Sequence, residues 1–154
     1  MFTEISKILD VKEEGKVSLH GWIANKRSSG GIQFISMRDG TGFIQCTMKK
    51  DKVGEKNFEE IEKLAAESVV EIEGTAKADK RAPGGYEVSI EKIKILSEAE
   101  GDFPITKKAH GLKFLLDNRH LSLRSPRMNA IMKIREKIID SARQWLKKSL
   151  YFYP

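Results

Sequence analysis

The sequence predicts a mainly β fold, a small five-stranded barrel, followed by a connecting segment and a long amphipathic helix. Short stretches of alternating apolar and polar residues, typical of strands, occupy much of residues 17–95. Glycine-containing turn signals at 30–31, 39–42 and 82–85 separate several of these stretches. Beyond residue 128, apolar residues recur every three to four positions, which is the spacing of a helix.

The composition excludes several classes of protein. The chain has 154 residues, of which 40% are hydrophobic and 32% charged, as in ordinary globular proteins rather than disordered or fibrous ones. No apolar run approaches the ~20 residues that cross a bilayer, so no membrane association is expected. Cys46 is the only cysteine, which excludes an internal disulfide. Together with an N-terminus that lacks the pattern of a secretory signal, this predicts a cytoplasmic protein.

The net charge of +6 is distributed unevenly along the chain. Residues 1–100 carry 16 Lys and Arg against 18 Asp and Glu, a balance of −2, whereas residues 101–154 carry 12 against 4, a balance of +8. A basic chain often binds a polyanion. Any nucleic-acid binding by the first hundred residues must therefore depend on where individual side chains are placed.

The strands and turns can be placed in order. The first strand covers 17–24, with Val17, Leu19 and Ile23 on one side, and Gly30-Gly31 turns the chain into a second strand over 32–38. Asp39-Gly40-Thr41-Gly42 is a hairpin signal before a third strand over 43–48. Helical spacing follows from Asn57, the expected N-cap, and strands are expected over 69–75 and 86–95.

Three strands, a helix and two strands within about 80 residues is the order of the OB-fold, a Greek-key barrel. The pattern by itself leaves open another small antiparallel barrel or an α+β domain. Residues 97–128 are predicted to be rich in loops, and Ser125-Pro126 is a good helix start. We expect three parts: a barrel domain over 1–100, a hinge over 101–128, and the start of a further domain over 129–154.

The final helix is predicted to carry one apolar stripe opposed by Lys and Arg side chains. This stripe needs a partner surface, which is the barrel, another chain, or a part of the protein beyond this sequence. Its residues are Ala130, Ile131, Ile134, Ile138, Ala142 and Trp145.

Alternation along the strands places several polar and aromatic side chains on the outer face of the barrel. Phe34, Gln45 and Glu87 are expected there, with Lys26 and Arg27 close by. An aromatic platform, hydrogen-bonding groups and cations are what an unstacked nucleic-acid base requires. Each residue also has an ordinary interpretation, since a one-residue register slip would put Phe34 in the core, and the others are common on solvated surfaces.

Other kinds of site are not indicated. The sequence has no Walker loop and no G-x-G-x-x-G, and no Ser/His/Asp or Cys/His set suggests a nucleophile. His20, His110 and His120 lack metal-ligand spacing, so neither a metal nor another cofactor is expected in this chain.

Several motifs resemble the anticodon-binding barrel of subclass IIb aminoacyl-tRNA synthetases. They are Gly21-Trp22-Ile23, Gly30-Gly31-Ile32-Gln33-Phe34, Arg38-Asp39-Gly40-Thr41-Gly42, Gln45-Cys46 and the loop Lys80 to Glu87. Asp102-Phe103-Pro104-Ile105 and Phe114 to Arg124 are similar to the hinge of asparaginyl-tRNA synthetases. Leu121-Ser122-Leu123-Arg124 stands where aspartyl enzymes more often have Met-Asp-Leu-Arg, which favours the asparaginyl group over the aspartyl one.

The resemblance implies a tRNA partner and a role for each outer-face residue. In the family, the aromatic at Phe34 stacks on an anticodon base, the amide at Gln45 hydrogen-bonds the central uracil, and the acid at Glu87 contacts the first anticodon base. Basic residues at Arg27 and Lys26 would contact the anticodon strand. The alternative from the residues is a general single-stranded nucleic-acid-binding module, against which the balance of −2 argues.

The resemblance also concerns the last helix. Residues 131–148 resemble the helix of class II motif 1, which implies a homodimer interface at Ile131, Ile134 and Ile138. Pro154 falls near that motif's proline, although residues 149–153 depart from its usual strand. Motifs 2 and 3, which hold ATP, are not found, so this chain alone is expected not to activate asparagine, while the parent enzyme would use ATP and magnesium. A third hypothesis is an interaction protein that acts mainly through the 130–146 stripe.

Overall fold

The computed structural model describes residues 2–101, 103–105 and 108–149. The chain forms two compact units that divide between Phe103 and Pro104. The first unit contains a barrel with the helices α1, α2 and α3, and the second unit is helical. Each unit is described by itself.

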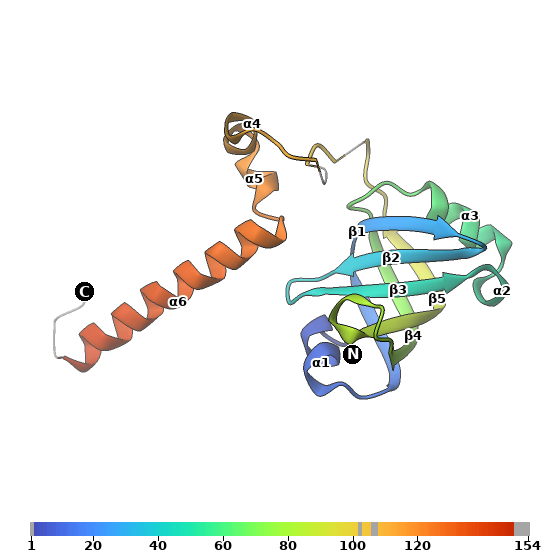
Figure 1. The fold of residues 1–154 in the computed structure, drawn as a ribbon, viewed down its shortest axis with the longest axis horizontal. Helices are drawn as coiled ribbons and strands as arrows, with labels where there is room; N and C mark the ends of the chain where they lie inside the picture. Colours follow the sequence, from blue (N-terminus) through green and yellow to red (C-terminus); the bar gives the residue numbers. More distant parts are fainter. Residues whose placement is uncertain (1, 102, 106–107, 150–154) are drawn as a thin grey trace. The chain divides into compact units, whose positions relative to one another are not determined.

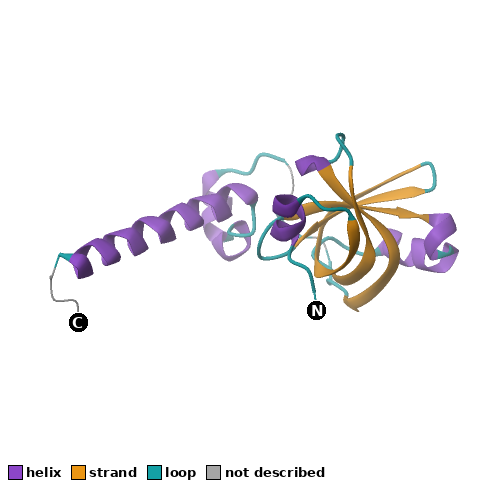
Figure 2. Cartoon of the chain, turned by 90° about the horizontal axis from the view of Figure 1, so that it is seen from below, coloured by secondary structure: helices purple, strands orange, loops and turns teal. Residues whose placement is uncertain are grey.

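The barrel consists of β1 (Gly15–Ser29), β2 (Ile32–Arg38), β3 (Phe43–Lys49), β4 (Val69–Ala78) and β5 (Tyr86–Ser97). The strands close in the order β1-β2-β3-β5-β4, and Figures 1 and 2 show them curling around a common centre. Neighbours are antiparallel except β3 and β5, which pair in parallel. This is the predicted five-stranded OB-fold with a helix between the third and fourth strands. Four strands run longer than expected, and β2 has its predicted bounds.

The core confirms the predicted faces of the strands. Side chains that alternate along each strand fill the barrel, with neighbours on the opposite face more exposed. Burial of so many branched apolar side chains is the main stabilisation of the barrel. The core residues on the strands with at most 1% exposure are Leu19, Ile23, Ile35, Met37, Ile44, Cys46, Met48, Val70, Ile72, Ala76, Val88 and Ile90.

Three glycines of the first hairpin meet a structural requirement. Gly30 and Gly31 both have positive φ, 56° and 76°, which a two-residue hairpin turn needs and which other residues adopt at a cost. Gly21 allows two strands to come close together, because a Cβ there would lie 2.2 Å from the carbonyl oxygen of Arg38. The tight curvature of β1 against β2 therefore depends on glycine.

The connection between β3 and β4 forms two short helices, α2 (Lys50–Val53) and α3 (Glu55–Lys63). The prediction of Asn57 as the N-cap is wrong: the helix begins at Glu55, and the side chain of Asn57 donates to the carbonyl oxygen of Val53 at 2.9 Å. Phe58 and Ile61 are buried, as the helical spacing predicted. The side-chain nitrogen of Gln33 also donates to the carbonyl oxygen of Phe58 at 2.9 Å, which fastens α3 to β2.

A helix at the N-terminus, α1 (Ile5–Val11), was not predicted. It buries Ile5 and Ile8 against the core cluster. Oδ2 of Asp39 accepts from the backbone nitrogen of Ile5 at 2.9 Å, so a loop residue from the predicted hairpin caps this helix from outside. At the other end of the helix, the hydroxyl of Tyr86 donates to the carbonyl oxygen of Lys12. Both anchors come from segments distant in the sequence.

The second unit contains α4 (Leu112–Asp117), α5 (Arg119–Ser122) and α6 (Pro126–Lys148). The stretch expected to be rich in loops thus includes two short helices. The predicted start of the long helix is confirmed: Ser125 is its N-cap, its hydroxyl accepts from the backbone nitrogen of Met128 at 3.4 Å, and Pro126 is the first helical residue. The prediction about residues 150–154, including Pro154, lies outside the described residues. Among the described residues, no helix is long and apolar enough to cross a membrane.

Candidate nucleic-acid interface

Phe34 lies on the outer face of β2, with the guanidinium of Arg27 over its ring. The two residues are direct cross-strand partners in the β1–β2 hairpin, and Cζ of Arg27 is 4.4 Å from the ring centroid. Phe34 is half-buried, whereas its neighbours Gln33 and Ile35 point into the core and are at most 2% exposed. The register is therefore the predicted one, and Phe34 is not a core residue. An aromatic ring beside a cation is suited to stacking on a base and to binding its phosphate.

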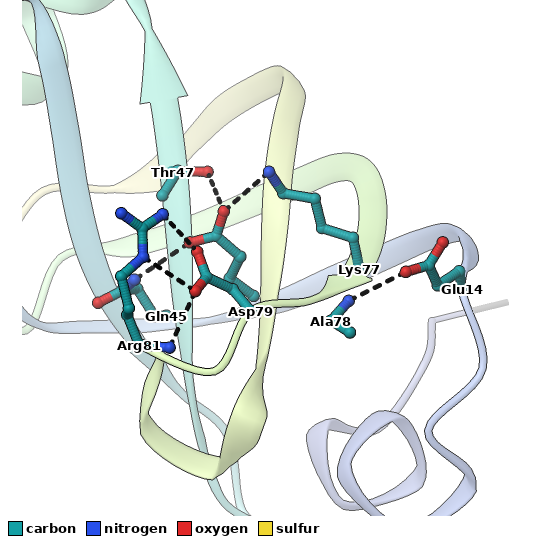
Figure 3. Close-up of polar contacts among 8 residues, drawn as sticks. Glu14, Gln45, Thr47, Lys77, Ala78, Asp79 and Arg81 are labelled. Atoms are coloured by element: carbon teal, nitrogen blue, oxygen red, sulfur yellow. Dashed lines mark hydrogen bonds and ion pairs between the residues drawn. The ribbon is translucent and has the colours of Figure 1, made fainter.

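Gln45 lies on the same outer face, on β3, opposite Glu87 of the parallel strand β5. The Gln45 side-chain nitrogen donates to Oε2 of Glu87 at 3.1 Å. Thr47 Oγ1 donates to Oε1 of the same carboxylate at 3.4 Å, and Lys77 Nζ lies 3.0 Å from that oxygen. Figure 3 shows the side chains of Gln45, Thr47 and Lys77 with these contacts drawn as dashed lines.

The burial of Glu87 differs from the sequence prediction. It lies on the predicted face, but it is only 4% exposed rather than a solvated outer acid. A buried carboxylate needs a counter-charge and hydrogen bonds, and Lys77, Thr47 and Gln45 supply them. The carboxylate is thus part of the floor of this face, with Gln45 above it as the more exposed group.

Lys26 is not brought together with Phe34. It pairs with Ile35 in the hairpin, so it points to the other side of β1 from Arg27. Its ammonium donates to the carbonyl oxygens of Ile61 and Glu62 at the C-terminal end of α3. Burial lowers the pKa of Lys26, and the charge of Glu62 acts in the opposite direction. This geometry is that of a helix cap rather than of a nucleic-acid contact.

Sequence reasoning missed Lys77 as part of this site and left Thr47 without a role. The hairpin register could have placed Lys77, since Ala78 pairs with Tyr86 around the 79–85 turn and Lys77 therefore faces Glu87. The same turn holds a further cation, Arg81, whose guanidinium forms an ion pair with Asp79 at 3.0 Å. Hydrogen bonds from Arg81 lower the pKa of Asp79. The hydrogen bonds from the backbone nitrogen, Nε and Nη2 of Arg81 to Asp79 are drawn in Figure 3.

The described part of the chain offers binding groups rather than reactive ones. Burial, with a further contribution from the charge of Glu87, raises the pKa of the Cys46 thiol to about 12, so it is not a nucleophile at neutral pH. Among residues 2–101, 103–105 and 108–149, no group of three or more His, Cys, Asp or Glu side chains could hold a metal ion. The arrangement around Phe34 and Gln45 can stack on a flat ring and hydrogen-bond its edge.

Comparison with known families agrees with this geometry. The family described as "OB-fold nucleic acid binding domain" matches residues 17–96, which is more than half of the chain and covers all five strands except their outermost residues. The chain belongs to this family. Phe34, Gln45 and Glu87 all lie within the matched region of the OB-fold domain.

Relatives of this chain have the name asparagine–tRNA ligase, and two of them serve as examples. The protein from Chloroflexus aurantiacus is 42% identical over 133 residues, which are 86% of this chain and 30% of the relative. The one from Deinococcus deserti is 44% identical over 134 residues, with the same coverage. The resemblance to asparaginyl-tRNA synthetases is thus confirmed. The chain spans under a third of the length of these relatives.

Solved structures of synthetases of this kind also resemble this chain, over residues of both units. Asparaginyl-tRNA synthetase from Pyrococcus horikoshii, complexed with asparaginyl-adenylate, matches 97% of this chain and 35% of its own, with 39% identity and a TM-score of 0.87. Aspartyl-tRNA synthetase from Entamoeba histolytica matches with 22% identity and a TM-score of 0.84, covering 97% of this chain and 38% of its own. The second likeness is one of fold alone.

Proposed function

We propose that this chain is the anticodon-binding region of an asparagine–tRNA ligase, whose whole reaction attaches asparagine to its tRNA at the expense of ATP. The observation that carries the proposal is the pairing of a half-exposed Phe34 under Arg27 with an outward Gln45 on the adjacent strand. These residues stand on the face that OB-folds use for oligonucleotides. The family and the relatives support this function independently of the geometry.

Each side chain has a separate task in this function. The ring of Phe34 stacks on one anticodon base, a contribution of about 1–3 kcal/mol that does not depend on sequence. Gln45 hydrogen-bonds the edge of the central uracil and supplies discrimination. Arg27 neutralises a phosphate of the anticodon strand. Lys26 is left out, because α3 already binds its ammonium. Glu87 remains the candidate contact for the first anticodon base, through the acceptor capacity that its protein partners leave.

An asparaginyl enzyme is favoured over an aspartyl one. The two asparagine–tRNA ligases and the asparaginyl-tRNA synthetase from Pyrococcus horikoshii are 39–44% identical to this chain. The asparaginyl and aspartyl structures from Entamoeba histolytica are 24% and 22% identical and do not separate the two groups. The hinge has Leu121-Ser122-Leu123-Arg124 where aspartyl enzymes more often have Met-Asp-Leu-Arg, which also favours the asparaginyl group. The two tRNAs differ at the third anticodon base, so binding can separate them.

The test is a fluorescence titration of the 154-residue chain at one stated salt concentration. It compares tRNA with the anticodon GUU, the same tRNA with GUC, and one in which the central U is replaced. We expect tight binding to GUU, weaker binding to GUC, and loss of binding on central replacement. Equal binding to all three would overturn anticodon recognition and leave a general single-strand binder with a steep salt dependence. Tighter binding to GUC would assign the chain to the aspartyl group.

The proposal assigns no cofactor to this chain and places ATP and magnesium with the whole enzyme. The task it gives to the chain is binding of tRNA, for which the groups around Phe34 and Gln45 are suited. We expect no asparagine-dependent pyrophosphate exchange from a pure sample whose mass has been verified. Exchange above a heat-inactivated control would contradict this part of the proposal. A cytoplasmic location, where such an enzyme would meet its tRNA, belongs to the same proposal.

We also propose that α6 pairs with a second copy of this chain. The side chains of Ile131, Ile134 and Ile138 are 45%, 62% and 64% exposed along one stripe of α6. Apolar stripes of this length usually bury against another surface. Sedimentation of the wild type should show a concentration-dependent dimer, which Ile134→Asp abolishes while Lys133→Asp, on the polar face, does not. A monomer at all concentrations would contradict the pairing.

A further inference from the structure

The amide of Gln45 has a fixed direction in this structure, and the direction follows from its partner. Gln45 faces Glu87 because β3 and β5 pair in parallel register at these two residues. An ionised carboxylate has only acceptor positions, so the nitrogen end of the amide must point toward it. The side-chain nitrogen of Gln45 lies 3.1 Å from Oε2 of Glu87. The oxygen of the amide is therefore left to accept from a ligand.

The carboxylate that fixes Gln45 is itself held from two further sides. Oε1 of Glu87 is 3.0 Å from Nζ of Lys77 and accepts from the hydroxyl of Thr47 at 3.4 Å. Glu87 is only 4% exposed, so water does little to stabilise its charge. Lys77 is the counter-ion of this buried carboxylate, and Thr47 restrains its rotation. The two residues approach from β4 and β3, on either side of β5.

We propose that Lys77 and Thr47 are positioning residues that lock Glu87, and that Glu87 in turn locks the amide of Gln45, so that the site distinguishes uracil from cytosine. This positioning role rests on the proposed function. Uracil presents a donor at N3 beside an acceptor at position 4, whereas cytosine presents an acceptor at N3 beside a donor at position 4. A free amide accommodates either order by rotating half a turn. A locked amide accepts one order and opposes the other.

Fixing the Gln45 amide explains why a carboxylate with a counter-ion is buried beneath a recognition face. The ion pair joins the buried Glu87 to Lys77, whose side chain is 46% exposed, and such a pair contributes little net stability, so its presence calls for another role. Orienting the neighbouring amide of Gln45 is such a role. If that amide were turned over, its nitrogen, a donor, would face the donor at N3 of uracil. A single well-made two-point contact between an amide and a base discriminates by roughly tenfold or more.

The decisive variant is Glu87→Gln in the full 154-residue chain. Its new amide presents its oxygen to Lys77, which can only donate, and therefore its nitrogen to Gln45, so the Gln45 amide can turn its own oxygen toward residue 87. The readout is the ratio of dissociation constants for tRNA with the anticodon GCU against GUU. We expect a ratio of roughly tenfold or more for the wild type, falling to about threefold or below in Glu87→Gln, because the turned amide offers a donor to N3 of cytosine. The first anticodon base is G in both tRNAs, so any change in its contact with Glu87 cancels in this ratio, and a merely structural loss would leave the ratio unchanged.

Lys77→Met and Thr47→Val test the two positioning residues. Both should narrow the same ratio, and Lys77→Arg should restore it by returning a cation to Glu87. The matched control for the lysine is Lys92→Met, which removes the same charge and an ion pair of the same 3.0 Å length, to Glu73, on the barrel surface. Thr75→Val is the control for Thr47, since the Thr75 hydroxyl donates to the exposed Glu91 at 2.8 Å. Neither control should change the ratio.

The outcomes separate this inference from the proposed function. Thermal denaturation first establishes that each variant is folded at the temperature of the titration. If the wild type binds GUU tightly but Glu87→Gln and Lys77→Met weaken GUU and GCU by equal factors, the lock is refuted and anticodon binding stands. If the wild type binds without distinguishing GUU from GCU, the lock is refuted as well. If the wild type binds neither tRNA, the proposed function fails and this inference fails with it.

Discussion

Arg27 lies over the ring of Phe34, with its Cζ 4.4 Å from the ring centroid, and the two residues face each other across the β1–β2 hairpin. The hairpin turn at Gly30-Gly31 is only a few residues away, so its geometry sets this pairing. The contact brings a cation and an aromatic platform together before any ligand is bound. It is the part of the proposed interface that depends least on distant parts of the chain.

Phe34→Ala should weaken binding to the GUU tRNA by about 5-fold to 100-fold, because the variant loses the stacking of one base. The stability of the barrel should change little, since the ring is half-exposed. The measurement is the same titration, with urea denaturation of both proteins. Phe43→Ala is the control: it removes a 38% exposed ring from the same sheet, roughly 13 Å along β3 from the position that faces Phe34. Equal losses in both variants would contradict specific stacking at Phe34.

Arg27→Gln and Lys26→Gln should affect different properties, RNA binding and stability respectively, although the two residues are neighbours in the sequence. Arg27→Gln should reduce affinity for every RNA tested and lower the slope of log affinity against log salt by about 0.7, because one phosphate contact is lost. Lys26→Gln should leave the slope unchanged and lower the free energy of unfolding by about 1 kcal/mol, since it removes the cation that caps α3. A change of the salt slope in Lys26→Gln would return Lys26 to the interface.

Asp39→Asn should destabilise the barrel in a pH-dependent way. Burial acts to raise the pKa of Asp39, but hydrogen bonds from Ile5, Thr41 and Gly42 outweigh it, so the pKa lies below its usual value. A carboxyl with a lowered folded-state pKa contributes stability above its unfolded pKa of about 3.9, and loses it as the pH falls through the folded value. The wild type should therefore be more stable than the variant at pH 7 by about 1–2 kcal/mol.

The same difference should shrink when urea denaturation is repeated at successively lower pH, below about pH 4. Asp10→Asn, a substitution of an exposed acid on α1, is the control and should change stability by no more than about 0.5 kcal/mol. A difference for Asp39→Asn that does not vary with pH would show that the carboxyl's charge has no part in holding α1.

Gly21→Ala should lower the free energy of unfolding by about 2 kcal/mol or more. The new Cβ would stand 2.2 Å from the carbonyl oxygen of Arg38, and both atoms belong to paired strands that cannot separate without breaking hydrogen bonds. Gly15→Ala on the same strand meets nothing within 4 Å, so it should cost less than about 0.5 kcal/mol. Equilibrium unfolding of both variants measures the contrast, and similar stabilities would show that β1 can shift away from β2 at this point.

The strands and their faces were predictable because they depend on neighbouring residues. Alternation placed Ile35 and Met37 inside the barrel and Phe34 outside, and the observed burial agrees. The start of α6 was predictable for the same reason, since Ser125 and Pro126 act on the adjacent turn of backbone. The helix α3 was located to within three residues at its start, where the N-cap was wrong because the short helix α2 leads directly into it.

Features that depend on contacts across long sequence separations were not predictable. The helix α1 begins where Asp39 caps it, 34 residues along the chain, and no local signal indicates that contact. Lys26 turns toward α3 rather than toward Phe34 because the end of that helix lies under β1. In each case a tertiary contact, rather than the type of residue, decides the role of the side chain.

The sequence by itself determined which side chains face outward, because alternation along an extended strand is a property of the local backbone. It also determined the family, through motifs that lie on single strands and turns. Only the tertiary structure decided what surrounds those side chains. Gln45 and Glu87 are 42 residues apart and meet because the barrel closes with β3 parallel to β5, and Lys77 reaches the same carboxylate from β4. Closure of the sheet, which no local signal encodes, makes Glu87 a buried, paired group beneath Gln45.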